Sequence, residues 1–282
     1  MIAATMGLWP WFSFEVRSAP PDDVQAALVE LLVDSVEHPP FWVGDVAPRI
    51  FLGVDSGPRS KVRTTRLKQS TPRSIRQAVT RPRNGQLCSG QVIFGDDDPP
   101  DVWISITFSP QTTIGTVHLA AADDVGFGRA VMDVASLLVR AAGDVMWGCG
   151  WFGGYSSPPL GSGIGVVPNP GEVVGYSYLM CLPPSVVERV GGADRVRRGP
   201  PELVRDVVTA SGQQCLITVL RDSPNDVSVE LLLEWRAFLA PALRSDALES
   251  RQAAFDRLSL TSGSAWYQLP PMVLPDDWPA PP

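Results

Sequence analysis

The segment 87–119 reads LCSGQVIF-GDDDPPD-VWISITF-SPQT-TIGTVHL and contains three mostly apolar runs, at 87–94, 102–108 and 113–119. The links between these runs carry the Gly, Pro, Asp and Ser residues that favour tight connections. In the middle run Ile104 and Ile106 alternate with Ser105 and Thr107, which predicts one buried and one more hydrated strand face. The segment therefore predicts an antiparallel meander in a sheet that is covered by helices on one side.

Helical spacing predicts an amphipathic helix on either side of the meander. The first helix is expected before the stop at 38–40. Its apolar positions follow an i, i+3, i+4 pattern: Val24, Ala27, Leu28, Leu31 and Leu32. The second segment, 127–142, has the same spacing, and we expect it to lie over the meander. Between them, Thr71 and Pro72 are typical of the N-cap and first residue of a short helix that continues to residue 80.

The remaining patterns extend the α+β class over the whole chain. Further strands are expected at 12–16, 50–54, 144–152, 176–182 and 215–220. Further helices are expected from Pro183-Pro184 to Gly191-Gly192, at 201–209 and at 227–239.

The order of these elements suggests two similar α/β halves, with one continuous domain as the alternative. The N-terminal half with the meander would span 1–152, and the C-terminal half 173–260. A Gly/Pro-rich loop, 153–172, separates them. Prolines and aromatic residues in 261–282 predict an extended Pro-rich C-terminal tail.

The charge distribution is the most polarised feature of the sequence. No Asp or Glu lies between residues 57 and 95, yet this zone holds nine cations: Arg59, Lys61, Arg63, Arg66, Lys68, Arg73, Arg76, Arg81 and Arg83. The remaining 14 Lys and Arg residues stand against 30 Asp and Glu residues in the whole chain. The protein is therefore an acidic body with one local positive zone, which influences the partners that approach it.

Three interpretations of the positive zone stay open. It is a solvated surface, a contact for an acidic protein partner, or a nucleic-acid site. Two observations disfavour the nucleic-acid site: no aromatic residue lies between Phe51 and Phe94, and the remainder of the chain is acidic. For a protein partner, the candidate contacts are the arginines of the zone and the acidic loop that follows it: Arg63, Arg66, Arg73, Arg76, Arg81, Asp96, Asp97 and Asp98.

The sequence contains no pattern that predicts catalysis, a metal or a cofactor. The four cysteines, at 88, 149, 181 and 215, form no CxxC pair, and we expect small buried thiols. Of the two histidines, His118 lies in a predicted strand and suits a partly buried structural role. We therefore expect a binding protein; the alternative is a small-molecule enzyme whose site is assembled from distant residues.

No apolar stretch approaches the roughly 20 residues that span a bilayer, and the N-terminus lacks a basic leader. We expect no membrane association and a cytoplasmic location.

Two short stretches carry a family resemblance within residues 125–243. The stretch 174–192, VGYSYLMCLPPSVVERVGG, and the stretch 239–243, LAPAL, resemble the type VI immunity family of bacterial polymorphic toxin systems. In that family an aromatic strand, a proline-opened short helix and a Gly-Gly stop precede a helix, a strand and a last helix with a Leu-x-Pro-x-Leu end. The loop at 153–172 and the Pro-rich tail depart from this pattern.

The resemblance implies an α+β protein without catalytic activity that binds a cognate toxin made by the same bacterium and neutralises it. It implies no fixed contact residues, because each member of the family fits its own toxin.

Overall fold

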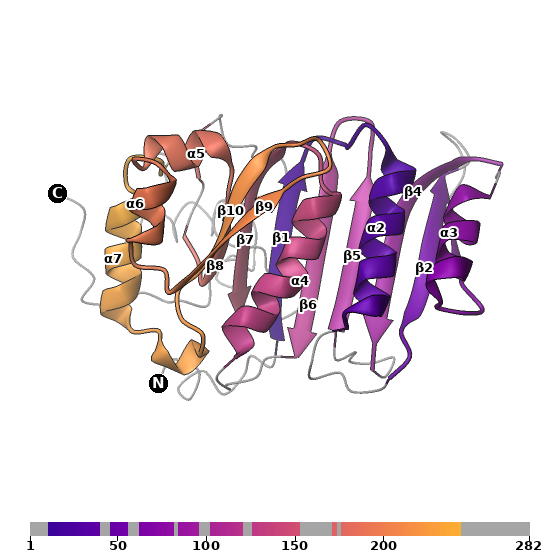
Figure 1. The fold of residues 1–282 in the computed structure, drawn as a ribbon, viewed down its shortest axis with the longest axis horizontal. Coiled ribbons are helices and arrows are strands. Elements are labelled where there is room, and N and C mark those ends of the chain that lie inside the picture. Colours follow the sequence, from indigo (N-terminus) through magenta and orange to yellow (C-terminus); the bar gives the residue numbers. More distant parts are fainter. Residues whose placement is uncertain are drawn as a thin grey trace, which may run out of the picture.

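The structure is a computed structural model, and it describes residues 11–39, 46–55, 62–81, 84–95, 102–120, 126–152, 171–173 and 176–243. The fold is α+β: one antiparallel sheet has ten strands in the order β3-β2-β4-β5-β6-β1-β7-β8-β10-β9 (Figure 1). The strands are β1 (Trp11–Ser18), β2 (Arg49–Asp55), β3 (Arg63–Arg66), β4 (Gln86–Phe94), β5 (Val102–Phe108), β6 (Thr113–Ala120), β7 (Val145–Phe152), β8 (Leu179–Leu182), β9 (Leu203–Val208) and β10 (Gln214–Val219). The helices are α2 (Val24–Glu37), α3 (Pro72–Thr80), α4 (Phe127–Ala141), α5 (Pro184–Arg189), α6 (Ala193–Arg197) and α7 (Val229–Leu239), with a 3-10 turn η2 (Pro224–Asp226).

The predicted meander is confirmed as β4, β5 and β6, which pair in sequence order. Its middle strand buries Ile104 and Ile106, whereas Ser105 is half-buried and Thr107 exposed on the opposite face. Helices α2, α3 and α4 lie over the buried face (Figure 1). The first part of the sheet is thus covered on one side, as the alternation predicts.

The cover of the meander is shared between two helices. Helix α2 packs on β4, and α4 packs on β6 and β1. Glycines on the buried face allow this close approach: a Cβ on Gly90 would stand 2.5 Å from Leu28 Cδ2, and one on Gly115 would stand 3.2 Å from Leu138 Cδ2. The expectation that the helix at 127–142 alone lies over the meander is therefore only half of the arrangement.

Helix α4 is enclosed by the sheet. Strands β9 and β10 swing forward over the face on which α4 lies, so that the helix contacts β1 and β6 on one side and β9 and β10 on the other (Figure 1). Twelve of its fifteen residues are buried. A helix that is buried over most of its surface in this way is part of the core rather than a surface layer.

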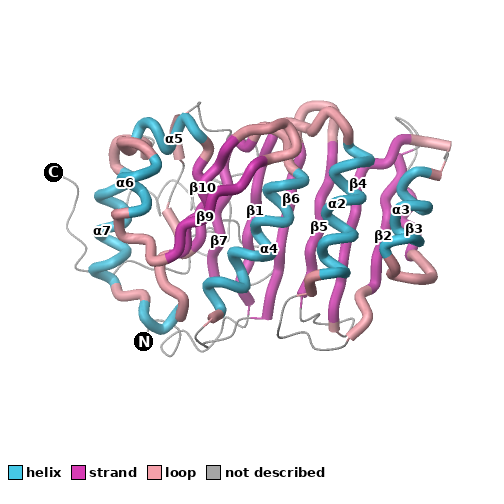
Figure 2. Tube along the Cα trace, viewed as in Figure 1, coloured by secondary structure: helices cyan, strands magenta, loops and turns pink. Residues whose placement is uncertain are grey.

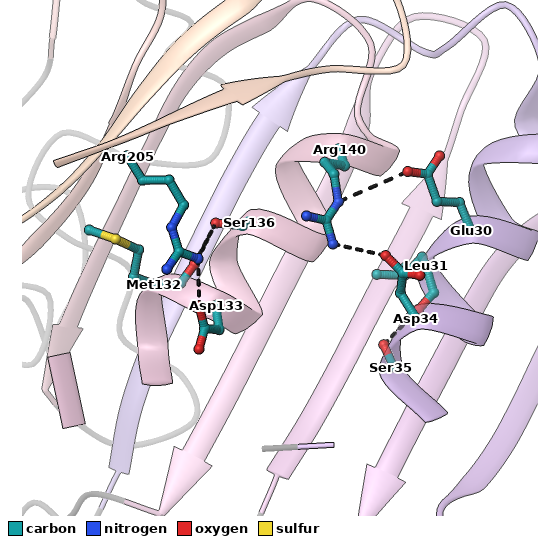
Figure 3. A network of polar contacts seen from close by, with 9 residues as sticks. All are labelled: Glu30, Leu31, Asp34, Ser35, Met132, Asp133, Ser136, Arg140 and Arg205. Carbon is teal, nitrogen blue, oxygen red and sulfur yellow. Dashed lines mark hydrogen bonds and ion pairs between the residues drawn. The ribbon is translucent and has the colours of Figure 1, made fainter. Parts of the chain in front are cut away.

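Ion pairs attach the exposed positions of α4 to both neighbours (Figure 3). The Arg140 guanidinium lies 2.8 Å from the Asp34 carboxylate of α2. On the other side, Arg205 of β9 lies 2.5 Å from the Asp133 carboxylate. The helix thus joins the first and last parts of the sheet.

The N-terminus of α4 is capped by a distant residue. Its N-cap, Gly126, has no side chain to offer, but the Asp222 carboxylate accepts a hydrogen bond from the Arg129 backbone N–H at 3.1 Å. The Asp222 backbone carbonyl accepts a second bond, from the Gly128 N–H, at 2.8 Å. The other carboxylate oxygen lies 3.3 Å from the Arg129 guanidinium. The buried Asp222 therefore satisfies the amides that a helix start leaves open.

Strands β8 and β10 are buried on both faces. All four residues of β8 and five of the six residues of β10 are buried. Helix α4 packs against one side of β10, and α5 also contacts this strand. The ring of Tyr178 is buried beside Phe12, and its hydroxyl donates to the Arg221 carbonyl at 2.7 Å. Strands β8 and β10 lack the hydrophobic alternation of the meander because they have no hydrated face.

The helix expected at 201–209 is wrong, because this segment is strand β9. Its Leu203, Val204, Val207 and Val208 also fit helical spacing, but β-branched residues fit a sheet equally well. A tight turn closed by the Gly212 N–H and the Thr209 carbonyl, 2.9 Å apart, returns the chain onto β10. Pairing with β10 thus decided the conformation, and the short strand β3 and helix α6 were likewise not predicted.

The predicted loop and tail lie almost wholly outside the described residues, as does the acidic loop with Asp96, Asp97 and Asp98. Strands from the two sides of 153–172 are neighbours, because β7 pairs with β8. The division into halves at 1–152 and 173–260 stays a prediction. Within the described ranges, no helix has the length and hydropathy required to cross a bilayer.

We expect Asp222→Ala to lower the free energy of unfolding by about 2 kcal/mol, because α4 loses its side-chain cap and leaves the Arg129 amide unpaired. The control is Asp226→Ala, which removes an exposed carboxylate four residues along the chain. Urea unfolding monitored by circular dichroism measures both. Equal stabilities of the two variants would contradict this role of Asp222.

Candidate interaction surface

The arginines of the positive zone gather at one end of the sheet. Strand β3 is the last strand at that end, and α3 lies at the same end beside α2 (Figure 2). We call the exposed cations on these elements the cationic end: Arg63, Arg66, Lys68, Arg73, Arg76 and Arg81. The structure thus brings the five predicted arginines together, whereas Asp96, Asp97 and Asp98 lie outside the described residues.

Local sequence fixes how α3 presents its arginines. As predicted, Thr71 is the N-cap: its Oγ1 accepts from the Ser74 N–H at 3.2 Å, and Ser74 Oγ accepts from the Thr71 N–H at 3.0 Å. Ile75 and Val79 are then buried toward α2. The cationic positions of the same helix consequently face solvent.

Cations elsewhere in the described chain are mostly paired with carboxylates. Ion pairs join Arg17 to Glu15, Arg129 to Asp222, Arg140 to Asp34, Arg189 to Glu172, Arg197 to Asp206 and Arg205 to Asp133. In contrast, Arg63, Arg66, Lys68, Arg73 and Arg76 form no ion pair with any described residue. The charges of these five residues of the cationic end are therefore left for solvent or for a partner.

The sheet edge inside this patch was missed from the sequence. Residues Arg63–Arg66 read RTTR, and all four are exposed. The adjacent β-branched Thr64 and Thr65 are the one signal of a strand, but four residues give too short a pattern to establish one. Only pairing with β2 shows that Arg63 and Arg66 lie on opposite faces of an edge strand.

A second polar cluster lies on the sheet face away from α2 and α4. In cross-strand register, Trp103, His118 and Ser13 are neighbours on β5, β6 and β1. His118 Nδ1 lies 2.9 Å from Ser13 Oγ, and its ring lies 5.2 Å from the Trp103 ring. Burial lowers the pKa of His118 to about 4, so the imidazole is neutral at physiological pH. The predicted structural role of His118 fits this geometry, because the Ser13 hydroxyl beside it is itself buried.

Next to this cluster is a charged pair held between strands. The Arg17 Nε donates to the Glu15 carboxylate at 2.7 Å, and both side chains are mostly buried. The Arg17 guanidinium lies 5.5 Å from the centre of the Trp147 ring, a cation–π distance. Because each charge has a close partner here, the pair serves the packing of this face.

A third feature is a surface depression of about 510 Å³ between α6 and α7. Phe238 forms part of its lining, with Gly199, Arg195, Arg198 and Glu234 around it. The Arg195 guanidinium lies 5.1 Å from the centre of the Phe238 ring. This depression presents an aromatic ring and two exposed cations, but its described lining contains no buried polar side chain.

Within the described ranges, no group of three or more His, Cys, Asp or Glu side chains is arranged to hold a metal ion. Cys149, Cys181 and Cys215 are buried, as expected for small core residues, and Cys88 is half-buried. Burial is the main cause that raises the pKa of the Cys149 thiol well above its usual range, which disfavours a reactive thiolate.

Comparison with solved structures gives a fold relative. The structure of Pseudomonas aeruginosa T6SS protein PA0821 is similar to this fold with a TM-score of 0.52 at 10% sequence identity, over 82% of this chain and 76% of that chain. At this identity the likeness concerns the fold alone. No protein-family model and no curated protein matches the chain.

We expect His118 to make the protein sensitive to acid. Its pKa of about 4 lies below the 6.5 of an unperturbed histidine, so the unfolded chain binds more protons between these values and stability falls as the pH falls through that window. Between pH 7 and pH 4, the wild type should therefore lose about 2 kcal/mol more than His118→Gln, whose amide does not titrate.

Urea unfolding of both proteins at pH 7, 5.5 and 4 measures this difference. Parallel losses in the wild type and His118→Gln would show that another group causes the acid sensitivity.

Proposed function

We propose that this protein is an immunity or antitoxin-like protein that binds a cognate bacterial toxin and neutralises it by occlusion. The cationic end is its contact surface. The partner it fits presents carboxylates, because the planar guanidinium pairs with carboxylate in two parallel hydrogen bonds.

The main support is the contrast between paired and unpaired arginines. Arg197 pairs with Asp206 through two contacts of 2.8 and 2.9 Å, and Arg140 pairs with Asp34. The chain also has acidic residues in excess over basic ones. Nevertheless, Arg63, Arg66, Arg73 and Arg76 are exposed at one end of the sheet without a described carboxylate partner. Arginine on such a surface is the residue type that interfaces favour.

The fold and the family resemblance supply the class of partner. The fold is similar to that of Pseudomonas aeruginosa T6SS protein PA0821. Independently, the stretches 174–192 and 239–243 resemble the type VI immunity family. Two of the expected features of that family occur here, the proline-opened helix α5 with its Gly-Gly end and α7, the last helix of the described residues.

The charge polarity also suits rapid capture of a toxin. The acidic body and the cationic end give the molecule two faces of opposite sign, which orient an approaching partner before contact. An acidic patch of the toxin would meet the cationic end, and a basic patch would meet the remainder.

Nucleic acid is the other polyanion that such a surface could attract, and it is tested separately. Titration of labelled DNA and RNA oligonucleotides at low and high salt gives a steep salt dependence if phosphates bind at the cationic end. On our proposal, neither oligonucleotide binds in the concentration range in which the toxin does.

We expect Arg73→Glu/Arg76→Glu to abolish protection in a bacterial host that coexpresses the product of the neighbouring gene, which on our proposal is the toxin. Reversing two interfacial charges should weaken the complex at least about 100-fold, because each reversed charge costs several kcal/mol against an acidic patch. Colony counts and the dissociation constant of the purified pair measure the effect.

The matched control is Arg195→Glu/Arg198→Glu, which makes the same change in net charge on exposed residues of the distant depression. It should keep protection. Loss of protection in the control alone would move the contact surface to the depression, and failure of the wild type to bind the neighbouring protein would refute the proposed function.

A further inference from the structure

The outer edge of β3 is an open end of the ten-stranded sheet. In the order of strands, β3 has β2 on one side and no described strand on the other. The opposite edge of the sheet, β9, differs because α6 packs beside it and Arg197 pairs with Asp206 there. An open edge presents a row of backbone donors and acceptors to which another extended chain can add.

The register identifies the groups that point outward. The Leu67 N–H donates to the Ile50 carbonyl at 2.9 Å, so this pair is hydrogen-bonded within the antiparallel ladder. Such pairs alternate, and the next one joins Leu52 to Thr65. The N–H and C=O groups of Thr64 and Arg66 therefore face away from β2.

The side chains at this edge specify the chemistry of the added strand. Arg63 pairs with Val54, which lies on the same sheet face as Leu52, and Leu52 is buried beneath the helices. Arg66 pairs with Phe51, which lies on the opposite face. A strand alongside β3 would therefore meet one arginine on each face, three residues apart. Val62, with 52% of its surface exposed, adds an apolar contact at the start of β3.

We propose that β3 accepts an extended segment of an acidic protein partner as an eleventh strand of the sheet. The segment carries Asp or Glu at positions three apart, so that one carboxylate meets Arg63 and the other Arg66. This inference rests on the proposed function and specifies how the cationic end engages its partner.

A second copy of this chain fits the edge poorly. Pairing β3 with itself would place Arg63 and Arg66 of one copy beside those of the other, and like charges opposite each other destabilise a strand pair. Arg73 and Arg76 of each copy would add to this repulsion. Charge complementarity therefore favours a different, acidic chain.

The test uses the full-length protein and a synthetic peptide, acetyl-Thr-Glu-Val-Thr-Glu-Val-amide, with Gln in place of Glu as the control peptide. We expect the acidic peptide to bind at least tenfold more tightly than its Gln form. On binding, hydrogen exchange of the Thr64 and Arg66 amides should slow at least fivefold, whereas that of Thr65, already bonded to β2, should not change.

The decisive variant is Thr64→Pro. Proline removes an N–H that points away from β2, so the existing ladder and the net charge stay unchanged. We expect at least a tenfold loss of peptide affinity, with full affinity in the matched control Thr64→Ala. Circular dichroism and the urea midpoint check that both variants fold; if Thr64→Pro unfolds, the exchange of the Thr64 and Arg66 amides in the wild type decides the matter.

Four outcomes would overturn the proposal. They are the absence of peptide binding, equal affinity of Thr64→Pro and wild type, protection of Thr65 without Thr64, and dimerisation through β3 in sedimentation. If the edge only prevents aggregation, the peptide does not bind and Arg63→Ala/Arg66→Ala self-associates.

Failure here is distinguishable from failure of the proposed function. Toxin neutralisation that depends on Arg73 and Arg76, with no peptide binding, would keep the immunity function and refute strand addition. Peptide binding at β3 by a protein that neutralises no neighbouring toxin would keep the edge and refute the immunity function.

Discussion

The enclosure of α4 is the constraint on which the described structure depends. A helix with apolar residues around most of its circumference must be covered from several sides. The sheet meets this need by curling, so that β1 and β6 lie beneath the helix while β9 and β10 return over it. Asp222 joins the same arrangement, because the loop after β10 reaches the helix start only when the sheet has closed over it. The N-terminal and C-terminal strands thus share one core.

This enclosure also explains the distribution of charge. Arginines near α4 and the C-terminal strands lie beside other elements and are fixed by carboxylates, as Arg140 and Arg205 are. The cationic end lies at the other end of the sheet, where β3 and α3 have solvent on their outer sides (Figure 2). Arg140 and Arg205 therefore pair with carboxylates around α4, whereas the arginines of β3 and α3 pair with no described carboxylate. On the proposed function, the cationic end is the surface that contacts the partner.

The elements of the fold differ in how well the sequence patterns predicted them. The meander, α2, α4 and the capped start of α3 were predicted because one face of each is hydrated, and alternation or helical spacing records that difference. Strand β9 was mistaken for a helix, since its valines fit both periods and β10 supplied the deciding hydrogen bonds. At the cationic end the arginines were identified from charge alone, whereas the edge strand that holds Arg63 and Arg66 was not predicted.

The amino-acid sequence by itself determined the α+β class, the meander and the concentration of positive charge, because periodicity and composition are local properties. Tertiary structure alone decided the order of the strands, the partner of each carboxylate and the edge left open. These depend on contacts between residues far apart in the chain, such as Arg129 with Asp222 and β1 with β7. Local patterns do not contain such pairings, since many alternative neighbours satisfy the same hydrophobic periodicity.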